Sequence, residues 1–327
     1  MDKIDFIVLW VDDSDPNWQR EKSKHTNHQS KNTLNKKNRY RDWDIFHYWF
    51  RGVEKYAPWV NKIHLVTAGH LPKWLNTNHP KLNTVKHSDF IPSEYLPTFS
   101  SRPIELNLHL IPELSNKFVY FNDDMFIVNS LKKEYFFKNN IPTDIGIRNP
   151  VPANEYGTVL YNTLLAIERN FDFNKTIRKI PTNWYNIKYG RLLIRNLLLM
   201  AWNRHLGYYT YHRPTSYIKK DFEIVWEKEN EVLHHTCLNK FRTTNDVNHQ
   251  IFRWWRLASN EFSPFNYLKI SKDIALESDI NILKPLKNQR FPLICLNDNE
   301  KTDFNLLKPE VDKILNRIFP DKSKFEI

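Results

Sequence analysis

Acidic and amide side chains follow an apolar stretch near the middle of the sequence. The residues from Phe118 to Phe121 are all aromatic or β-branched, which predicts a buried strand. Asn122, Asp123 and Asp124 come directly after it. Two adjacent carboxylates at the end of a buried strand are costly to bury unless a cation neutralises them, and oxygen ligands of this kind suit Mg²⁺ or Mn²⁺. The alternative interpretation is an Asx-rich turn that caps the next helix.

Two further apolar stretches lead into acidic residues. Ile4 to Trp10 has the composition of a strand and is followed by Asp12 and Asp15. Arg290 to Leu296 is a second such strand, and Asp298 follows it. Because ligands of α/β sheets bind at strand ends, we expect these carboxylates to contribute to one site. A solvated turn is the alternative interpretation for each of them taken alone.

Histidine, arginine and glutamate residues in polar surroundings supply further candidates. His212 and Arg242 lie in the C-terminal half, although a lone histidine is structural more often than catalytic. Pro103 predicts the first turn of an amphipathic helix, on which Glu105 and His109, four residues apart, share a face. A surface pair is the alternative interpretation of these two residues.

Strands that alternate with helices predict an α/β fold, namely a Rossmann-like or GT-A-like mixed sheet flanked by helices. Helical spacing of aromatic residues predicts a helix over Trp43–Tyr56, and Ile63–Thr67 is the next strand. The polar, basic stretch 19–38 is expected to be a mobile loop, with a lid over an anionic ligand as the alternative.

We expect one catalytic domain over residues 1–300, with a core of 1–140 and 205–300 and a helical insertion at about 142–205. The apolar segment Leu192–Trp202 within this insertion predicts a core helix, with a membrane-surface helix as the less favoured alternative. Residues 301–327 form a C-terminal helix and tail, in which Pro309–Phe319 is the amphipathic part.

Composition limits the classes of partner. The net charge of +11 suits nucleic acid, an anionic membrane surface or a polyanionic substrate equally well, but no nucleic-acid-binding motif is present and we expect no nucleic acid partner. The six glycines are too far apart for a phosphate-binding glycine loop, so a bound nucleotide needs a metal and side-chain cations. Two cysteines and the lack of signal-peptide features at the N-terminus predict a cytoplasmic protein, at most peripheral to the inner face of the membrane.

Four blocks of the sequence, in order, resemble the conserved regions of the Stealth family. These proteins are the sugar-1-phosphate transferases of bacterial capsule and exopolysaccharide synthesis, and they include the lysosomal-enzyme N-acetylglucosamine-1-phosphotransferase of animals. The blocks are Ile4–Pro16, Arg39–Asp124, His212–Asp246 and Leu296–Asn299.

The resemblance implies that the protein transfers hexose-1-phosphate, for example N-acetylglucosamine-1-phosphate, from a UDP-sugar to a hydroxyl of a glycan acceptor. UMP leaves and a phosphodiester forms. The donor-binding residues that the resemblance implies are Trp10, Asp12, Asp15, Arg41, Asn122 and Asn297.

The residues themselves suggest a mechanism for such a transfer. Both the transferred group and the UMP leaving group are anionic, so their charge must be neutralised. We expect Asp124 and Asp298 to bind Mg²⁺ or Mn²⁺, with Asp123 as a further ligand or as support for the ligands. Further along the chain, Arg242 contacts the phosphates, His212 is the general base, and Glu105 positions the acceptor hydroxyl or shares the base role.

Two other functions remain as alternatives. A metal-dependent UDP-sugar glycosyltransferase uses the same aspartates but breaks the sugar C1–O bond, releases UDP and does not require His212. A basic protein that binds carbohydrate or polyanions without catalysis is the second alternative, but such a protein gains nothing from acidic residues at strand ends.

Overall fold

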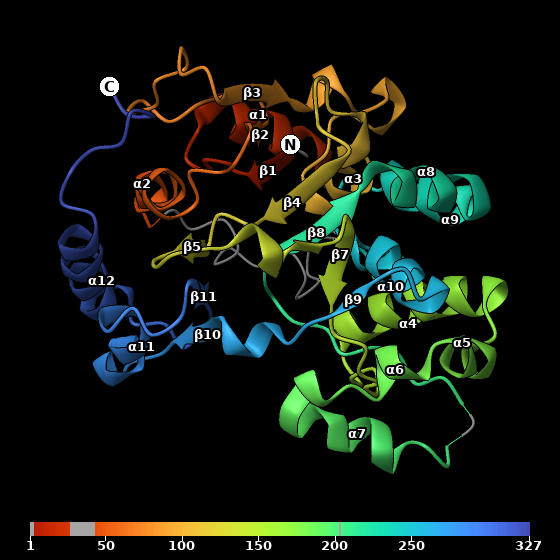
Figure 1. Cartoon of the computed structure of the whole chain (residues 1–327). Helices are drawn as coiled ribbons and strands as arrows, with labels where there is room; N and C mark the ends of the chain where they lie inside the picture. The colour runs from red at the N-terminus through yellow and green to blue at the C-terminus, as the bar shows by residue number, and fades with distance from the viewer. Residues whose placement is uncertain (1–2, 27–42, 203) are drawn as a thin grey trace.

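The computed structural model describes residues 3–26, 43–202 and 204–327. A five-stranded sheet lies at the centre, with strand order β3-β2-β1-β4-β8 (Figure 1). The first four strands are parallel, and β8 runs antiparallel to β4. In chain order the strands are β1 (Ile4–Leu9), β2 (Ile63–Thr67), β3 (Leu82–Lys86), β4 (Lys117–Phe121) and β8 (Thr215–Ile218).

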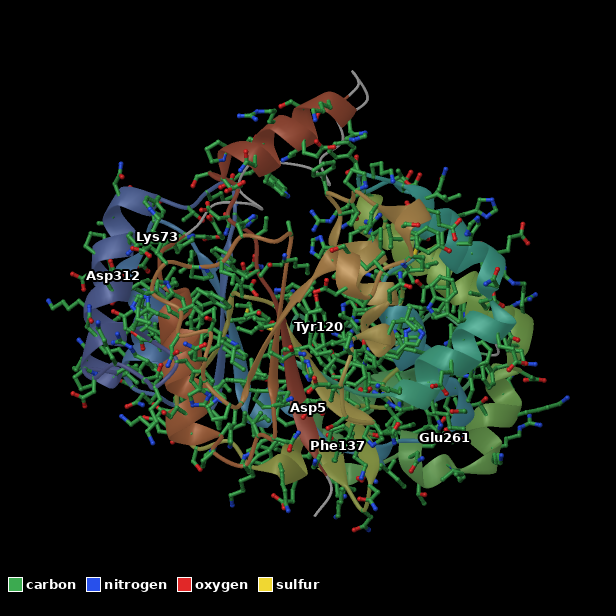
Figure 2. All side chains as sticks on the ribbon, turned by 90° about the horizontal axis from the view of Figure 1, so that it is seen from above. Asp5, Lys73, Tyr120, Phe137, Glu261 and Asp312 are labelled. Carbon is green, nitrogen blue, oxygen red and sulfur yellow. The ribbon has the colours of Figure 1, made fainter. Side chains whose placement is uncertain are left out.

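Helices cover both faces of this sheet because its central strands are apolar on both sides. Along β1, Phe6 and Val8 face a core that contains α2 (Phe46–Tyr56), whereas Ile7 faces a second core that contains α10 (Gln250–Ser259). Figure 2 shows the same arrangement from above. Asp312 marks α12 on one side of the strands, and Glu261, which follows α10, lies on the other side. The remaining α-helices are α1 (Pro16–His25), α3 (Ser101–Leu106), α4 (Glu155–Asn170), α5 (Phe173–Lys179), α6 (Pro181–Trp184), α7 (Leu193–Leu198), α8 (Lys219–Lys228), α9 (Asn230–Leu238), α11 (Lys284–Lys287) and α12 (Phe304–Ile318).

Two small sheets extend the central one. The first has the order β10-β11-β5, and the second has the order β6-β7-β9. The chain leaves β4, passes through residues 122–124 and enters β5 in the first small sheet, where the backbone N–H of Leu296 donates to the carbonyl oxygen of Asp124 at 2.9 Å. This crossing brings the end of β11 beside the acidic residues that follow β4. The strands are β5 (Met125–Ile127), β6 (Phe137–Lys138), β7 (Ile141–Asp144), β9 (Ser263–Pro264), β10 (Ser271–Leu276) and β11 (Leu293–Asp298).

The predicted mixed α/β fold with flanking helices is confirmed, as are the strands that became β1, β2 and β4. The turn after β4 leads into a strand and not into a helix, so the alternative of a helix-capping turn is wrong. Both cysteines are buried and free. Within the described parts of the chain, no helix combines the length and hydrophobicity that crossing a membrane requires.

The sequence predicted a mobile loop over residues 19–38. This prediction is wrong for residues 19–25, which belong to helix α1. Helix α1 forms there because Asp15 caps it by accepting from the backbone N–H of Trp18, and Pro16 occupies its first turn. Trp18 is buried, which fixes the helix against the rest of the protein. Residues 27–42, which include the rest of the expected loop, lie outside the described residues.

The predicted helix from Pro103 is also corrected. Helix α3 begins at Ser101, because Ser100 caps it, and it ends at Leu106 before a short 3₁₀ turn. Glu105 and His109 therefore do not share a helix face, and they are not a surface pair, since Glu105 is buried.

Three boundaries near the end of the chain and in the insertion differ from expectation. The insertion begins with strand β7, which pairs with β6 and β9. Asn297 and Asp298 belong to β11 itself and do not follow it. Helix α12 begins at Phe304 and contains Pro309. Burial of its apolar face outweighs the cost of a proline inside a helix. The buried residues of this face are Leu307, Val311, Ile314, Leu315 and Ile318.

The prediction of a core helix at Leu192–Trp202 is wrong. The segment contains α7, a helix of six residues, whose outer side faces solvent. Leu198 is 77% exposed and Trp202 is 54% exposed.

Candidate active site

A cavity of about 950 Å³ lies at the carboxyl ends of β1 and β4 and beside the end of β11. This is the position that the α/β rule predicts for a ligand, because parallel strands end at one edge of the sheet. Nine of the residues expected in the site lie in its wall: Trp10, Glu105, Asn122, Asp123, Asp124, His212, Arg242, Asn297 and Asp298.

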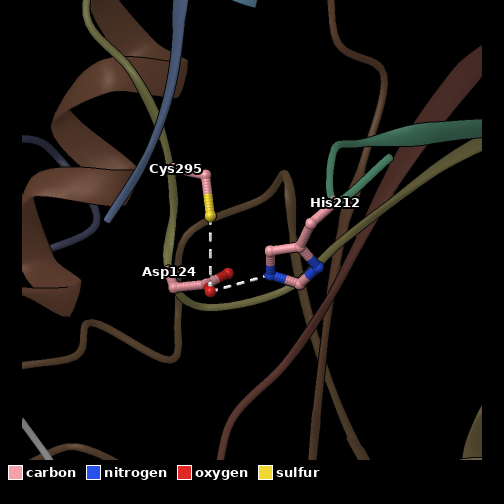
Figure 3. Close-up of side chains that lie close together, drawn as sticks. All are labelled: Asp124, His212 and Cys295. Atoms are coloured by element: carbon pink, nitrogen blue, oxygen red, sulfur yellow. Dashed lines mark hydrogen bonds and ion pairs between the residues drawn. The ribbon is translucent and has the colours of Figure 1, made fainter. Parts of the chain in front are cut away.

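Asp124 lies between His212 and Cys295 (Figure 3). Its Oδ2 is 2.8 Å from Nε2 of His212 and 3.4 Å from Sγ of Cys295. Ligand atoms of these three side chains all lie within 4.8 Å of one another, which makes them a candidate metal-binding group. The other carboxylate oxygen, Oδ1, is buried and has no hydrogen-bond partner among the described residues. A buried carboxylate oxygen without a partner is costly, so this oxygen fits a divalent cation.

Burial and the charge of Asp124 together set the direction of the pKa shifts of its two neighbours. Burial lowers the pKa of His212, but the Asp124 carboxylate and its hydrogen bond, with Asp273 and Asp123, outweigh burial and raise it. His212 therefore takes up a proton more readily than an ordinary histidine. Burial raises the pKa of the Cys295 thiol, and Asp124 raises it further, so the thiol stays protonated and donates a hydrogen bond to Asp124.

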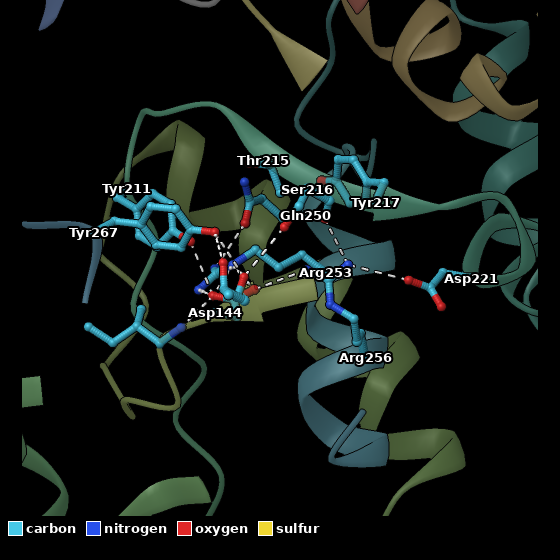
Figure 4. A network of polar contacts seen from close by, with 12 residues as sticks. Asp144, Tyr211, Thr215, Ser216, Tyr217, Asp221, Gln250, Arg253, Arg256 and Tyr267 are labelled. Atoms are coloured by element: carbon cyan, nitrogen blue, oxygen red, sulfur yellow. Dashed lines mark hydrogen bonds and ion pairs between the residues drawn. The ribbon is translucent and has the colours of Figure 1, made fainter. Parts of the chain in front are cut away.

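A buried ion-pair network fixes the segment that carries His212 (Figure 4). The neighbouring Tyr211 donates its hydroxyl to Asp144 of β7 at 3.1 Å, and the guanidinium of Arg253 lies 4.6 Å from the centre of the tyrosine ring. Arg253 and Arg256 of α10 both pair with Asp144, at 2.8 and 3.1 Å. These contacts tie α10, β7 and the His212 segment together.

Glu105 lines the cavity and accepts a hydrogen bond from a tyrosine. The hydroxyl of Tyr120, on β4, lies 3.1 Å from Oε1 of Glu105 and 2.6 Å from Oδ1 of Asn122. Burial, followed by the charge of Glu105, raises the pKa of Tyr120 well above its usual range, so the hydroxyl stays protonated. Tyr120 thus links α3 to the residues that follow β4.

Two arginines, Arg102 and Arg242, lie in the cavity wall. Arg242 donates to Oγ of Ser101 at 3.2 Å. Arg102 is buried and pairs with Asp246, which also accepts from the backbone N–H of Thr243 at 2.9 Å. Asp246 therefore anchors the loop that carries Arg242 at the cavity wall.

Asp298 lines the same cavity but is not part of the group around Asp124. Its Oδ2 accepts from the indole N–H of Trp43 at 3.0 Å. Because side chains alternate along β11, Asp298 and Cys295 point to opposite faces of the strand. Joint binding of one metal by Asp124 and Asp298 therefore stays a prediction.

Comparison with known proteins identifies the family of this chain. Residues 2–27 match the family model of Stealth protein conserved region 1, and residues 39–144 match that of conserved region 2. A capsular polysaccharide phosphotransferase, WcwK of Streptococcus pneumoniae, is 43% identical over 100% of this chain and 99% of its own length. This chain belongs to the Stealth family of phosphotransferases.

Other relatives of this Stealth protein carry similar names. The receptor polysaccharide phosphotransferase WefC of Streptococcus oralis is 36% identical over all of both chains. The exopolysaccharide phosphotransferase cps2G of Lactiplantibacillus plantarum is 33% identical over 99% of this chain and 96% of its own. The predicted family is confirmed, and the protein is a transferase. The proposed third and fourth blocks, His212–Asp246 and Leu296–Asn299, stay predictions.

Solved structures align loosely with the Stealth chain. Galactosyltransferase LgtC in complex with donor and acceptor sugar analogs covers 98% of both chains, with a TM-score of 0.44 and 11% identity. The bifunctional glycosyltransferase WbbM covers 96% of this chain and 50% of its own, with a TM-score of 0.41 and 11% identity. Such loose similarity supports no inference about the reaction.

Two of the residues that the Stealth resemblance implied for donor binding, Asp12 and Asp15, do not lie in the described cavity wall. Asp12 accepts from the backbone N–H of Ser14 at 2.8 Å, and Asp15 caps α1. Arg41 lies outside the described residues. Their roles stay predictions.

The cavity also contains residues that the sequence did not single out. His249 lies in the wall, and its Nδ1 is 2.8 Å from the hydroxyl of Tyr217 on β8. Burial lowers the pKa of His249, although the charge of Glu105 opposes this effect. Its position just before α10 gives no local signal of function, because only the packing of α10 on the sheet brings it to the cavity.

Proposed function

We propose that this Stealth protein transfers hexose-1-phosphate, such as N-acetylglucosamine-1-phosphate, from a UDP-sugar to a hydroxyl of a glycan acceptor. The proposed setting is capsular or exopolysaccharide synthesis, which the names of the relatives support. The observation that carries the chemistry is the pair of Asp124 and His212, 2.8 Å apart in a cavity that also contains Arg242.

In the proposed reaction the acceptor oxygen attacks the phosphorus that carries the sugar. A new P–O bond forms, the P–O bond to UMP breaks, and the hydroxyl proton passes to His212. Nε2 of His212 already contacts Asp124, which leaves Nδ1 to accept this proton. Asp124 then stabilises the imidazolium that results.

The remaining cavity residues fit the binding of a charged donor. Mg²⁺ or Mn²⁺, bound by Asp124 and Asp298 with Asp123 nearby, would neutralise charge on the diphosphate. Arg242 would contact the phosphates through its planar guanidinium, while Glu105, held by Tyr120, would position the acceptor hydroxyl. Trp10, Asn122 and Asn297 would contact the donor.

The catalytic unit that we propose comprises residues 1–300, which contain the cavity wall apart from Lys301, with 301–327 as the C-terminal helix and tail. The proposed place of action is the cytoplasm, at the inner face of the membrane. Two free cysteines fit a reducing compartment.

Identifying the nucleotide product tests the proposed function. The protein is incubated with a panel of UDP-sugars, Mg²⁺ and acceptor glycan, and the products are followed by chromatography and by ³¹P spectroscopy. We expect UMP together with a phosphodiester signal, and we expect EDTA and Asp124→Ala to abolish both. Release of UDP would overturn the proposal in favour of a metal-dependent UDP-sugar glycosyltransferase, and salt-sensitive glycan binding without turnover would indicate a non-catalytic binding protein.

A further inference from the structure

The region around α7 exposes an unusual number of large apolar side chains. It lies at the edge of the molecule, away from strands β1 to β3 (Figure 1). A large group of exposed apolar side chains on one region of a surface usually marks an interaction site. The α7 patch consists of Ile187 (87% exposed), Ile194 (55%), Leu197 (49%), Leu198 (77%), Met200 (66%) and Trp202 (54%).

Contacts on the inner side of α7 hold these side chains outward. Asn196 is buried, and its side-chain amide donates to the carbonyl oxygens of Gly146 and Trp184 at 2.7 and 2.6 Å. Its side-chain oxygen accepts from the backbone N–H of Arg148 at 2.8 Å. The inner side of the helix is therefore occupied by satisfied polar contacts, and burying the α7 patch there would break them.

In the sequence around the α7 patch, all lysine, arginine, aspartate and glutamate positions are occupied by lysine or arginine. Segment 173–205 contains seven lysines and arginines and no aspartate or glutamate, which is +7 of the net charge of +11. The four cations nearest in sequence to the apolar side chains are Lys188, Arg191, Arg195 and Arg204. All seven are exposed: Lys175, Arg178, Lys179, Lys188, Arg191, Arg195 and Arg204.

The charge decides between two occupants of the α7 patch. In a symmetric dimer the patch would face its own copy and bring cations against cations. At an anionic membrane surface, apolar side chains insert at the boundary of headgroups and acyl chains, and tryptophan is favoured at the same depth. The anionic headgroups attract the cations. We propose that the α7 patch docks the protein on an anionic membrane surface.

The α7 region is connected to the segment that carries His212. Nine residues lie between Trp202 and His212 in the sequence. Leu192 and Leu193, on the inner side of the α7 region, pack in the same small cluster as Tyr211. Because the docking does not depend on the reaction, binding to vesicles is measured without substrates, and the two proposals fail independently.

Vesicle flotation with the full chain tests the docking. Vesicles of phosphatidylcholine with phosphatidylglycerol are compared with vesicles of phosphatidylcholine alone. We expect the protein to float with the anionic vesicles only, and high salt is expected to weaken this binding because it screens the lysines and arginines.

Matched variants locate the binding surface. Leu198→Glu is expected to weaken binding about ten-fold, because it removes one side chain from the apolar contact. The control Leu238→Glu, at an exposed leucine at the end of α9, should bind as the wild type does.

Reversing two charges tests the contribution of the cations. Arg191→Glu with Arg195→Glu should weaken binding at least about twenty-fold, since each cation contributes about five-fold. Lys284→Glu with Lys287→Glu, which changes the net charge equally on α11, is the control for charge alone.

Several results would overturn the docking proposal. These are a wild type that does not float, a Leu198→Glu variant that binds like Leu238→Glu, and two charge-reversed variants that weaken binding equally. A lipid-free dimer that Leu198→Glu dissociates would assign the α7 patch to a second copy. Unchanged thermal unfolding of each variant shows that the fold is intact, as expected for substitutions at exposed side chains.

Discussion

At the scale of single residues, Asp124 connects the groups that chemistry at this site would need. Its side chain contacts His212 and Cys295, and its backbone carbonyl accepts from Leu296 of β11. One carboxylate therefore links the end of β4, the segment before β8 and the end of β11. Changing its charge while keeping its shape separates its chemical role from its packing.

We expect Asp124→Asn to lower kcat/KM by about 10²–10³-fold, because the amide is uncharged and can neither bind a divalent cation well nor stabilise an imidazolium. Steady-state kinetics over a range of Mg²⁺ concentrations measures this loss. Cys295→Ser, beside the same carboxylate, should stay within a few-fold of wild type. A Cys295→Ser variant that loses as much activity as Asp124→Asn would indicate a thiolate ligand and contradict the oxygen-ligand site.

At the scale of elements, one buried carboxylate holds three parts of the fold together. Asp144 ends β7 and pairs with two arginines of α10, and it also accepts from Tyr211, which precedes His212. Burial raises the pKa of Asp144, but the charges of Arg253 and Arg256 outweigh burial and lower it, so the carboxylate is ionised in the folded protein. Such networks destabilise a protein strongly when one partner is removed, because the remaining charges stay buried and unpaired.

Asp144→Asn is expected to lower the free energy of unfolding by about 3–5 kcal/mol, since it leaves two buried guanidinium groups without their common counter-ion. Urea unfolding followed by tryptophan fluorescence measures the change. The control Asp221→Asn removes a carboxylate that contacts only one of the two arginines, Arg256 at 3.3 Å, and should cost less. A loss below about 1 kcal/mol for Asp144→Asn would mean that the network does not stabilise these elements.

At the scale of the whole molecule, acid should unfold the protein partly through Asp5. This residue of β1 is fully buried and accepts from three places in the central layer: His64 of β2 at 3.1 Å, Asn61 at 2.7 Å and the backbone N–H of Ser115 at 2.7 Å. Burial raises the pKa of Asp5, but these hydrogen bonds together lower it below 3.8.

A lowered folded-state pKa means that this stabilisation is fully present above the ordinary value of 3.8 and is lost as the pH falls further, through the folded-state pKa. We therefore expect the difference in free energy of unfolding between wild type and Asp5→Asn to shrink below pH 3.8. Urea unfolding at a series of pH values measures it. Two curves that stay parallel down to the acid transition would show that Asp5 is not the titrating group.

The sequence by itself determined the local elements and the family. Apolar runs at β1, β2 and β4 are recognisable because burial on both faces requires them. Nine of the residues expected in the site from the sequence lie in the cavity wall. Helices whose ends depend on caps were placed less well. Asp15 begins α1 inside a stretch whose polar composition predicted a loop.

The tertiary structure decided which side chains meet. Cys295 and His249 had no local signal, because β11 is brought beside Asp124 by a crossing between sheets and His249 by the packing of α10. It also decided that the apolar segment at α7 faces outward, since Asn196 uses the inner side of the helix for hydrogen bonds. Hydrophobicity predicts that a side chain prefers burial, but contacts between residues distant in sequence determine whether the folded chain offers a place to bury it.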